Sequence, residues 1–114
     1  MGQKRAASAP RVALLAVGDG SARRSASAPG YLDERAAPFD ESVERAVRDG
    51  DLPAIAALDP ALAAALLAAG RPAWQALAGA LSAPHAAAAA RLRTEVLYSD
   101  APLGVAYLVA TLVP

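Results

Sequence analysis

The sequence has 114 residues, of which 55% are apolar, and its basic and acidic side chains balance to zero net charge. This length and balance suit one folded domain and exclude a disordered charged tail or a strongly basic nucleic-acid-binding protein. Because there is no cysteine, disulfides and thiolate metal sites are excluded, and we expect a cytoplasmic protein.

Residues 1–10 have no hydrophobic period and end in proline, so we expect a disordered lead-in followed by a single α/β domain over residues 11–114. The domain begins with RVALLAV, an almost unbroken apolar run that stops at a glycine-rich loop. Such a run predicts a strand buried on both faces. It is too short to span a membrane, and its flanks do not suit a signal peptide.

A long connection over residues 18–38 follows this strand, and we expect a short helical turn at residues 32–37 to shorten it. Connections of this length inside a compact domain are usually functional or disordered. In open α/β sheets, ligands bind beyond the carboxyl ends of the strands. The candidate ligand-binding residues are therefore Gly18, Asp19, Gly20, Ser21, Arg23 and Arg24.

These loop residues favour a small anionic ligand, because amides around two glycines and two guanidinium groups can all donate to an anion. The loop nevertheless has neither the lysine and spacing of a P-loop nor a GxGxxG pattern. A tight strand exit with solvated arginines is the alternative interpretation.

Four helices are predicted downstream. Residues 38–49 carry an apolar face that begins at Phe39 and a charged opposite face. Asp51 and Asp59 each stand shortly before a proline and an alanine-rich run, an N-cap signature for helices at residues 53–58 and 60–70. Residues 71–81 form the fourth helix, in which we expect Trp74 to anchor the packing of helix against sheet.

The C-terminal part predicts two strands. Residues 82–93 indicate either a helix or a linker. Residues 94–98 and 104–113 are rich in β-branched and aromatic side chains around a polar turn, which is typical of strands. The fold expected is α/β, with a small mixed sheet of about three strands and helices packed on it. Because a strand buried on both faces needs neighbours on both sides, we expect a homo-oligomer or a complementing chain to complete the sheet.

The residues that could support catalysis or bind a metal are few. Asp19, Asp33 and Glu34 carry carboxylates suited to a hard cation, but their separation gives no ligand geometry, and a surface ion pair of Glu34 is simpler. His85 is the single histidine, so one copy cannot form a two-histidine iron or zinc site. Ser21 lacks a GxSxG frame. We expect no catalytic or metal-ligating residues, and neither nucleic acid nor membrane as a partner.

Several stretches together resemble a known family: VGDGSARR, APGYLDERAAPFDESV, AGRPAWQALAGAL and LYSDAPLGVAYLVA. They are similar to the C-terminal half of actinobacterial proteins of the class III extradiol ring-cleavage dioxygenase family, in the branch that is like its B-type subunit, over roughly residue 11 to the end. The resemblance implies an α/β fold. In active members of the family it also implies a ferrous iron, bound by two histidines and a glutamate, that helps dioxygen cleave a catecholic ring.

The catalytic residues of that family have no counterparts here. The iron-binding histidines belong to its N-terminal half, and Ala22 follows Ser21 where the family has an acid/base histidine. The helix expected to supply the carboxylate reads ALAAALLAAG. We therefore expect a non-catalytic domain with a structural or small-ligand-binding role and no cofactor in this chain. The alternative is a non-haem Fe(II)-dependent dioxygenase completed by another chain or by a missing N-terminal half.

Overall fold

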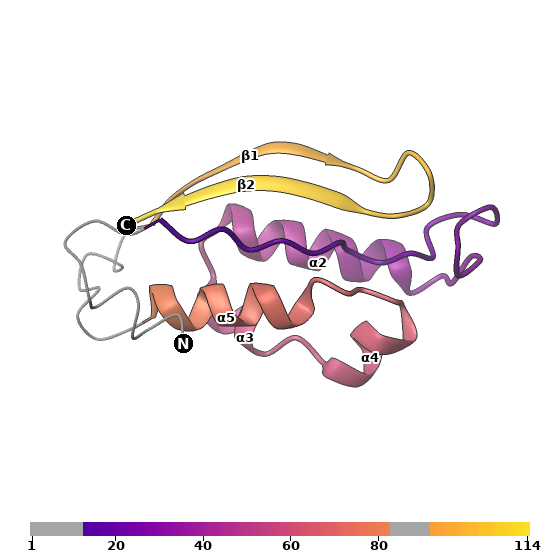
Figure 1. The fold of residues 1–114 in the computed structure, drawn as a ribbon, viewed down its shortest axis with the longest axis horizontal. Helices are drawn as coiled ribbons and strands as arrows, with labels where there is room; N and C mark the ends of the chain where they lie inside the picture. The colour runs from indigo at the N-terminus through magenta and orange to yellow at the C-terminus, as the bar shows by residue number, and fades with distance from the viewer. Residues whose placement is uncertain (1–12, 83–91) are drawn as a thin grey trace.

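The computed structural model describes residues 13–82 and 92–114. The expected lead-in at residues 1–10 and most of the helix or linker at residues 82–93 lie outside this part, as does His85. The described residues form four helices and a two-stranded antiparallel sheet (Figure 1). The elements are α2 (Ala36–Arg48), α3 (Leu52–Ala56), α4 (Pro60–Ala65), α5 (Arg71–Leu81), β1 (Arg93–Asp100) and β2 (Tyr107–Val113).

The helices follow the local signals in the sequence. Helix α2 begins at Ala36 and so includes part of the predicted helical turn. The carboxylate of Asp51 accepts the amide of Ala54 at 3.1 Å, which confirms the predicted N-cap of α3. Asp59 caps α4 in the same way, and α5 has the predicted bounds. None of the described helices is long and apolar enough to cross a membrane.

Helix α4 is shorter than predicted, because the chain leaves the helix at Leu66 and not at Gly70. Leu67 has a positive φ of 57°, a left-handed conformation that ends an α-helix. The amide of Ala68 then turns back to the carbonyl of Ala63 at 2.8 Å. This turn buries Leu66 completely. Residues 61–69 are all alanine or leucine, so the sequence contains no glycine that would mark the end of the helix at Leu66.

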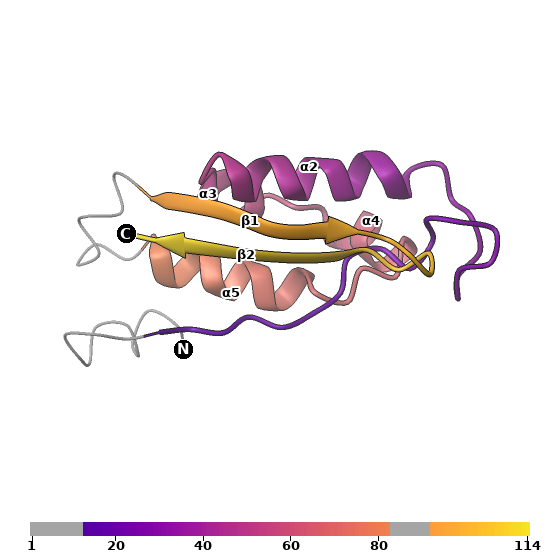
Figure 2. The ribbon, with the colours of Figure 1, turned by 90° about the horizontal axis from the view of Figure 1, so that it is seen from above.

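The sheet differs from the prediction. Strands β1 and β2 pair antiparallel with a bulge between Val96 and Tyr98, so the described sheet is neither mixed nor three-stranded. The predicted strand at residues 11–17 is wrong in its described part, where residues 13–17 form no strand. Leu15 and Val17 keep 89% and 74% of their surface exposed. No described helix or strand covers the outer face of this segment, so it is not the buried central strand that was expected (Figure 2).

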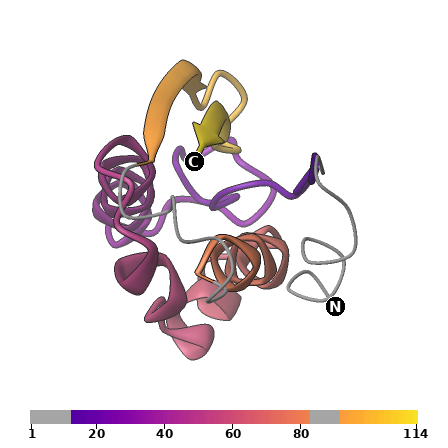
Figure 3. The ribbon, with the colours of Figure 1, turned by 90° about the vertical axis from the view of Figure 1, so that its left-hand side faces the viewer.

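The core lies between the helices and one face of the hairpin. Seen end-on, α2 lies below β1, α3 and α4 lie below α2, and α5 lies beside α3 (Figure 3). One buried cluster surrounds Phe39 and Leu66, and a second surrounds Leu52 and Ile55. Trp74 packs against both clusters. Trp74 therefore anchors the packing among the helices, whereas the prediction had it anchor helix against sheet.

Gln75 joins α5 to the C-terminal end of α3. Its Nε2 atom donates to the carbonyl oxygens of Ala56 at 3.0 Å and of Leu58 at 3.2 Å, which are free at the end of the short helix. Its Oε1 atom accepts a hydrogen bond from Arg71 at 2.6 Å. A polar side chain thus adds hydrogen bonds to the apolar packing between two helices.

We expect Leu66→Ala to lower the free energy of unfolding by about 2–5 kcal/mol, because Leu66 is fully buried and alanine would leave a cavity. Urea unfolding followed by circular dichroism measures this loss. Leu103→Ala is the matched control, since Leu103 is 74% exposed and its truncation should change stability by less than about 0.5 kcal/mol. Equal effects of the two substitutions would contradict this account of the core.

Candidate functional site

The loop expected to bind a ligand crosses the start of α5 before it reaches the sheet. The carbonyl of Asp19 accepts the amide of Gly70 at 2.8 Å. A Cβ atom on Gly18 would lie 2.4 Å from the Cα of Gly70, so the crossing needs glycine at this position. The amide of Gly20 donates to Ala106 at 2.8 Å, next to the beginning of β2. The loop is therefore fixed to α5 on one side and to the hairpin on the other.

Ser21 is fully buried and forms a polar cluster with Asp40 of α2. Its hydroxyl donates to Asp40 Oδ2 at 2.6 Å, and its amide donates to Asp40 Oδ1 at 3.0 Å. Arg24 adds an ion pair to the same Oδ2 atom at 3.3 Å. One carboxylate thus accepts three donors from the loop, and it satisfies the hydroxyl that folding removes from water.

Arg23 points away from this cluster. Its Nη1 atom donates to the carbonyl of Ala65 at 3.0 Å and lies 3.6 Å from Asp33 Oδ2. Asp33 also receives two hydrogen bonds from the guanidinium of Arg35. These bonds, with that from the Arg35 amide, hold the pKa of the Asp33 carboxyl well below its usual range. The two arginines of the loop therefore form ion pairs with different carboxylates, Arg23 with Asp33 and Arg24 with Asp40.

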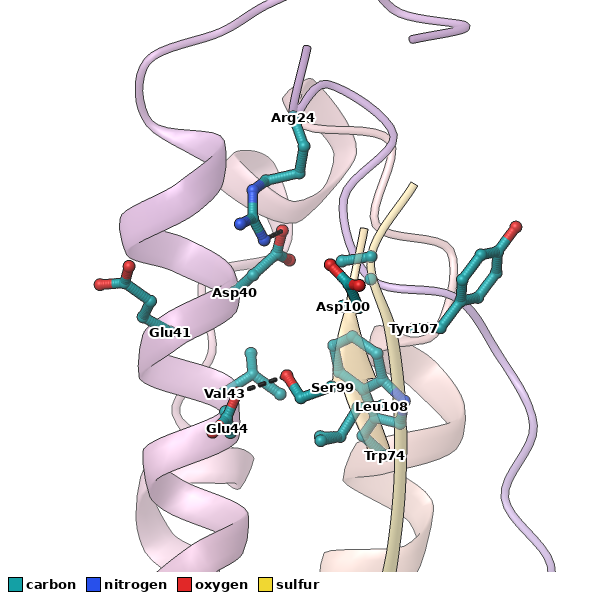
Figure 4. A pocket seen from close by; sticks show the side chains of 12 residues that line it. Arg24, Asp40, Glu41, Val43, Glu44, Trp74, Ser99, Asp100, Tyr107 and Leu108 are labelled. Atoms are coloured by element: carbon teal, nitrogen blue, oxygen red, sulfur yellow. Dashed lines mark hydrogen bonds and ion pairs between the residues drawn. The ribbon is translucent and has the colours of Figure 1, made fainter. Parts of the chain in front are cut away.

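A cavity of about 240 Å³ lies between α2 and the hairpin (Figure 4). Arg24 reaches down to Asp40 at one end of it, and Ser99 of β1 faces Glu44 of α2 across it. The ring of Trp74 closes the cavity from the side of α5. The remaining lining residues are Gly20, Glu41, Val43, Asp100, Ala106, Tyr107 and Leu108.

Glu44 connects the helix to the sheet. Its carboxylate accepts hydrogen bonds from the hydroxyl of Ser99 and from Arg48 Nη2, the latter at 2.5 Å. These two hydrogen bonds lower the pKa of the Glu44 carboxyl below its ordinary value of 4.5, and the bond from Ser99 has the larger effect. Glu44 therefore stays ionised beside the cavity at neutral pH.

The structure brings only part of the predicted site together. Gly20 and Arg24 line the cavity. Ser21 does not line it, but its hydroxyl donates to Asp40, which does. Gly18, Asp19 and Arg23 do not line it. The six predicted residues therefore do not all face this cavity, and the anion site stays a prediction.

The sequence did not single out the residues that complete the cavity: Asp40, Glu44, Ser99, Asp100 and Tyr107. Asp40 and Glu44 stand four residues apart, and this spacing places them on one face of α2. The sequence predicts only that these two side chains lie on the charged face of the helix. It does not show that the loop and the hairpin lie opposite that face.

The described residues do not fit an iron centre of the kind that the family resemblance implies. Within residues 13–82 and 92–114, no group of three histidine, cysteine, aspartate or glutamate side chains is placed to share a metal ion. Two of the carboxylates that line the cavity, Asp40 and Glu44, are already engaged by Arg24, Ser99 and Arg48. We therefore derive no step through iron.

No family model matches this sequence, and neither a curated protein nor a solved structure is similar enough to it to count as a match. The kinship with the extradiol dioxygenase family stays a prediction, which rests on the quoted stretches alone.

We expect Asp40→Ala to lower the free energy of unfolding by about 1–3 kcal/mol, because it leaves the buried hydroxyl and amide of Ser21 without an acceptor. Glu41→Ala removes the neighbouring, exposed carboxylate and is the matched control, with little expected effect. Adding Ser21→Ala to Asp40→Ala should recover part of the loss, since the hydroxyl is then gone as well. Urea unfolding measures these free energies. If the loss in the double variant equals the sum of the losses in the two single variants, the proposed interaction between Ser21 and Asp40 is contradicted.

We expect Ser99→Ala to raise the pKa of Glu44 toward 4.5, because it removes the strongest hydrogen bond to the carboxylate. Since the folded-state pKa lies below the unfolded one, Glu44 stabilises the fold above pH 4.5, and that contribution is lost as the pH falls through the folded-state pKa. The variant should show less of this acid-induced loss. Carbon-13 NMR titration of the Glu44 carboxyl measures the shift.

Ser42→Ala provides the control for this titration. The hydroxyl of Ser42 also lies on α2, but it donates to the carbonyl of Phe39 and not to Glu44. The pKa of Glu44 should therefore not change in this variant. A pKa that is the same in the Ser99→Ala variant and in the unmodified protein would show that the bond between strand and helix is absent in solution.

Proposed function

We propose that this chain is a small-molecule-binding domain whose ligand is an organic cation held in the cavity between α2 and the hairpin. The charge around the cavity is the observation that carries the proposal. Among the described residues, four carboxylates line it, those of Asp40, Glu41, Glu44 and Asp100, against the single guanidinium of Arg24. Asp40 and Glu44 are ion-paired with Arg24 and Arg48, which leaves the carboxylates of Glu41 and Asp100 to favour a positively charged guest.

The aromatic wall supports the same chemistry. The ring of Trp74 lies at the inner side of the cavity, on the side of α5 (Figure 4). Ammonium and guanidinium groups are attracted to the face of an indole ring, so Trp74 and the carboxylates attract the same kind of group. At about 240 Å³ the cavity is smaller than the ~300–1,000 Å³ of drug-sized sites, so the ligand has few atoms.

The predicted small anionic ligand has weaker support from the geometry. Both guanidinium groups that would receive it are engaged, Arg24 with Asp40 at 3.3 Å and Arg23 with Asp33 at 3.6 Å. An anion would have to displace these carboxylates and then approach Glu44. A cation can instead approach Glu41 and Asp100, which form no ion pair among the described residues.

This function fits the non-catalytic role expected of a dioxygenase-like domain. Binding requires only the cavity, whereas ring cleavage by a complemented iron site requires donors that the described residues do not bring together. The resemblance to the dioxygenase family and the cytoplasmic location remain parts of the proposal that only the sequence supports.

Butylamine, butanamide and butyrate differ mainly in charge, so they test whether the cavity prefers a cationic, a neutral or an anionic ligand. We expect butylamine to change the fluorescence of Trp74 in a saturable way, because Trp74 is the single tryptophan and lines the cavity. The neutral and anionic analogues should give little response. Higher salt should weaken the amine response by screening. A saturable response to butyrate alone would refute the cation and support the anionic ligand.

Asp100→Asn removes one of the charges at the cavity. The affinity for butylamine should fall roughly twofold to fivefold, as expected for a partly exposed ion pair worth under about 1 kcal/mol. Asp49→Asn is the matched control, because Asp49 is exposed at the end of α2 and does not line the cavity. Equal affinities of the two variants and the unmodified chain would place the amine elsewhere.

A further inference from the structure

One edge of β2 has unused backbone groups. The amide of Ala106 donates to the carbonyl of Ser21, away from β1. Because N–H and C=O groups alternate between the two edges of a strand, those of Leu108, Ala110 and Leu112 point to this same outer edge. In the part of the chain that the structure describes, no backbone hydrogen bond joins these three residues to another segment outside the sheet.

Residues 13–19 lie along this edge without pairing with it. The segment runs antiparallel to β2, as Figure 1 shows, and Figure 2 shows it diverging from β2 toward its N-terminal end. Its other end is already paired, because Gly20 donates to Ala106 at 2.8 Å and Ala106 donates to Ser21 at 2.8 Å. Two residues opposite one form the pattern of a β-bulge, which fixes the register of whatever precedes it.

That register predicts the pairs that a third strand would form. Continued from Gly20 and Ala106, it places Gly18 opposite Leu108, Ala16 opposite Ala110 and Leu14 opposite Leu112. Opposed residues in an antiparallel pair point to the same face of a sheet. Leu108, Ala110 and Leu112 are the half-buried residues of β2 that face the helices.

The segment already has the matching alternation. Leu15 and Val17 are 89% and 74% exposed, whereas Ala16 between them is half-buried; Leu14 is 36% exposed, and Gly18 is exposed. The carbonyl of Asp19 points to Gly70 and so away from β2, as the same alternation requires. At residues 15–17 the inner and outer faces of the segment therefore agree with those of β2, and no shift of register is needed.

We propose that residues 13–19 close onto β2 as a third, antiparallel edge strand. An apolar cavity of about 90 Å³, lined by Ala16 and Gly18, by one face of β2 and by apolar side chains of the helices, provides the driving force. Closure removes this apolar lining from water and pairs backbone groups of β2 for which no described segment provides a partner. Leu15 and Val17 stay on the outer face, so the strand is an edge strand and not a buried one.

Hydrogen exchange and nuclear Overhauser effects on the whole chain test the closure. Amides that face the shared edge should exchange at least roughly tenfold more slowly than those of Leu15 and Val17, which face away. The slow amides should be those of Ala16, Gly18, Leu108, Ala110 and Leu112. Contacts between the Hα atoms of Val17 and Val109, and of Leu15 and Thr111, should appear, because these are the close, non-hydrogen-bonded pairs of the predicted register.

A pair of proline variants separates closure from a merely extended segment. Ala16→Pro removes an amide that faces β2 and should abolish the slow exchange of Ala110 and the Hα contacts. Leu15→Pro removes an amide that faces solvent, which an edge strand tolerates, and should retain most of the protection. Equal behaviour of the two variants would contradict the proposed register.

Two results would overturn the proposal. Fast exchange at Leu108, Ala110 and Leu112 together with no Hα contacts would show that the edge of β2 stays open. The same contacts observed between differently labelled copies in a mixed sample would show that a second chain, and not the segment of the same chain, occupies the edge.

Discussion

The arrangement of the loop depends on the carboxylate of Asp40. Ser21 is completely enclosed, and an enclosed hydroxyl without a partner would oppose folding. Asp40 satisfies this hydroxyl and the amide of the same residue, and it binds Arg24 as well. The carbonyl of Ser21 accepts the amide of Ala106, so the same residue also holds the hairpin. Loop, helix and sheet therefore meet at one polar point, which also forms one end of the cavity.

Alanine determines how the rest of the core is built. Most of the buried apolar residues in the described part of the chain are alanines, so helices approach closely but each contact removes little surface from water. Two features compensate. Trp74 fills the space between the two buried clusters, and Gln75 joins α5 to α3 through hydrogen bonds. A core with small residues therefore depends on a few large or polar side chains for its geometry.

Local signals in the sequence were sufficient to predict the hairpin and the presence of the four helices, though not the end of α4, because caps, prolines and short-range periodicity act within a few residues. Asp51, Asp59 and the bounds of α5 are examples. The apolar run before Gly18 was misjudged because burial on both faces depends on neighbours that are distant in sequence. Half of the predicted site, Gly20, Ser21 and Arg24, lies at or behind the cavity, whereas Asp40 and Glu44 were missed because their partners come from the loop and from β1.

The two cavities share a wall, and this connects the two proposals. Val43, Trp74 and Leu108 line both the polar cavity and the apolar one. A strand that closes on the apolar side packs against the same side chains that a ligand contacts on the polar side. If the packing on one side changes the positions that these side chains favour, the affinity on the other side changes too, and linkage requires the effect to be reciprocal. Trp74 is the residue through which such coupling would be carried, because it is the largest side chain in the shared wall and contacts both buried clusters.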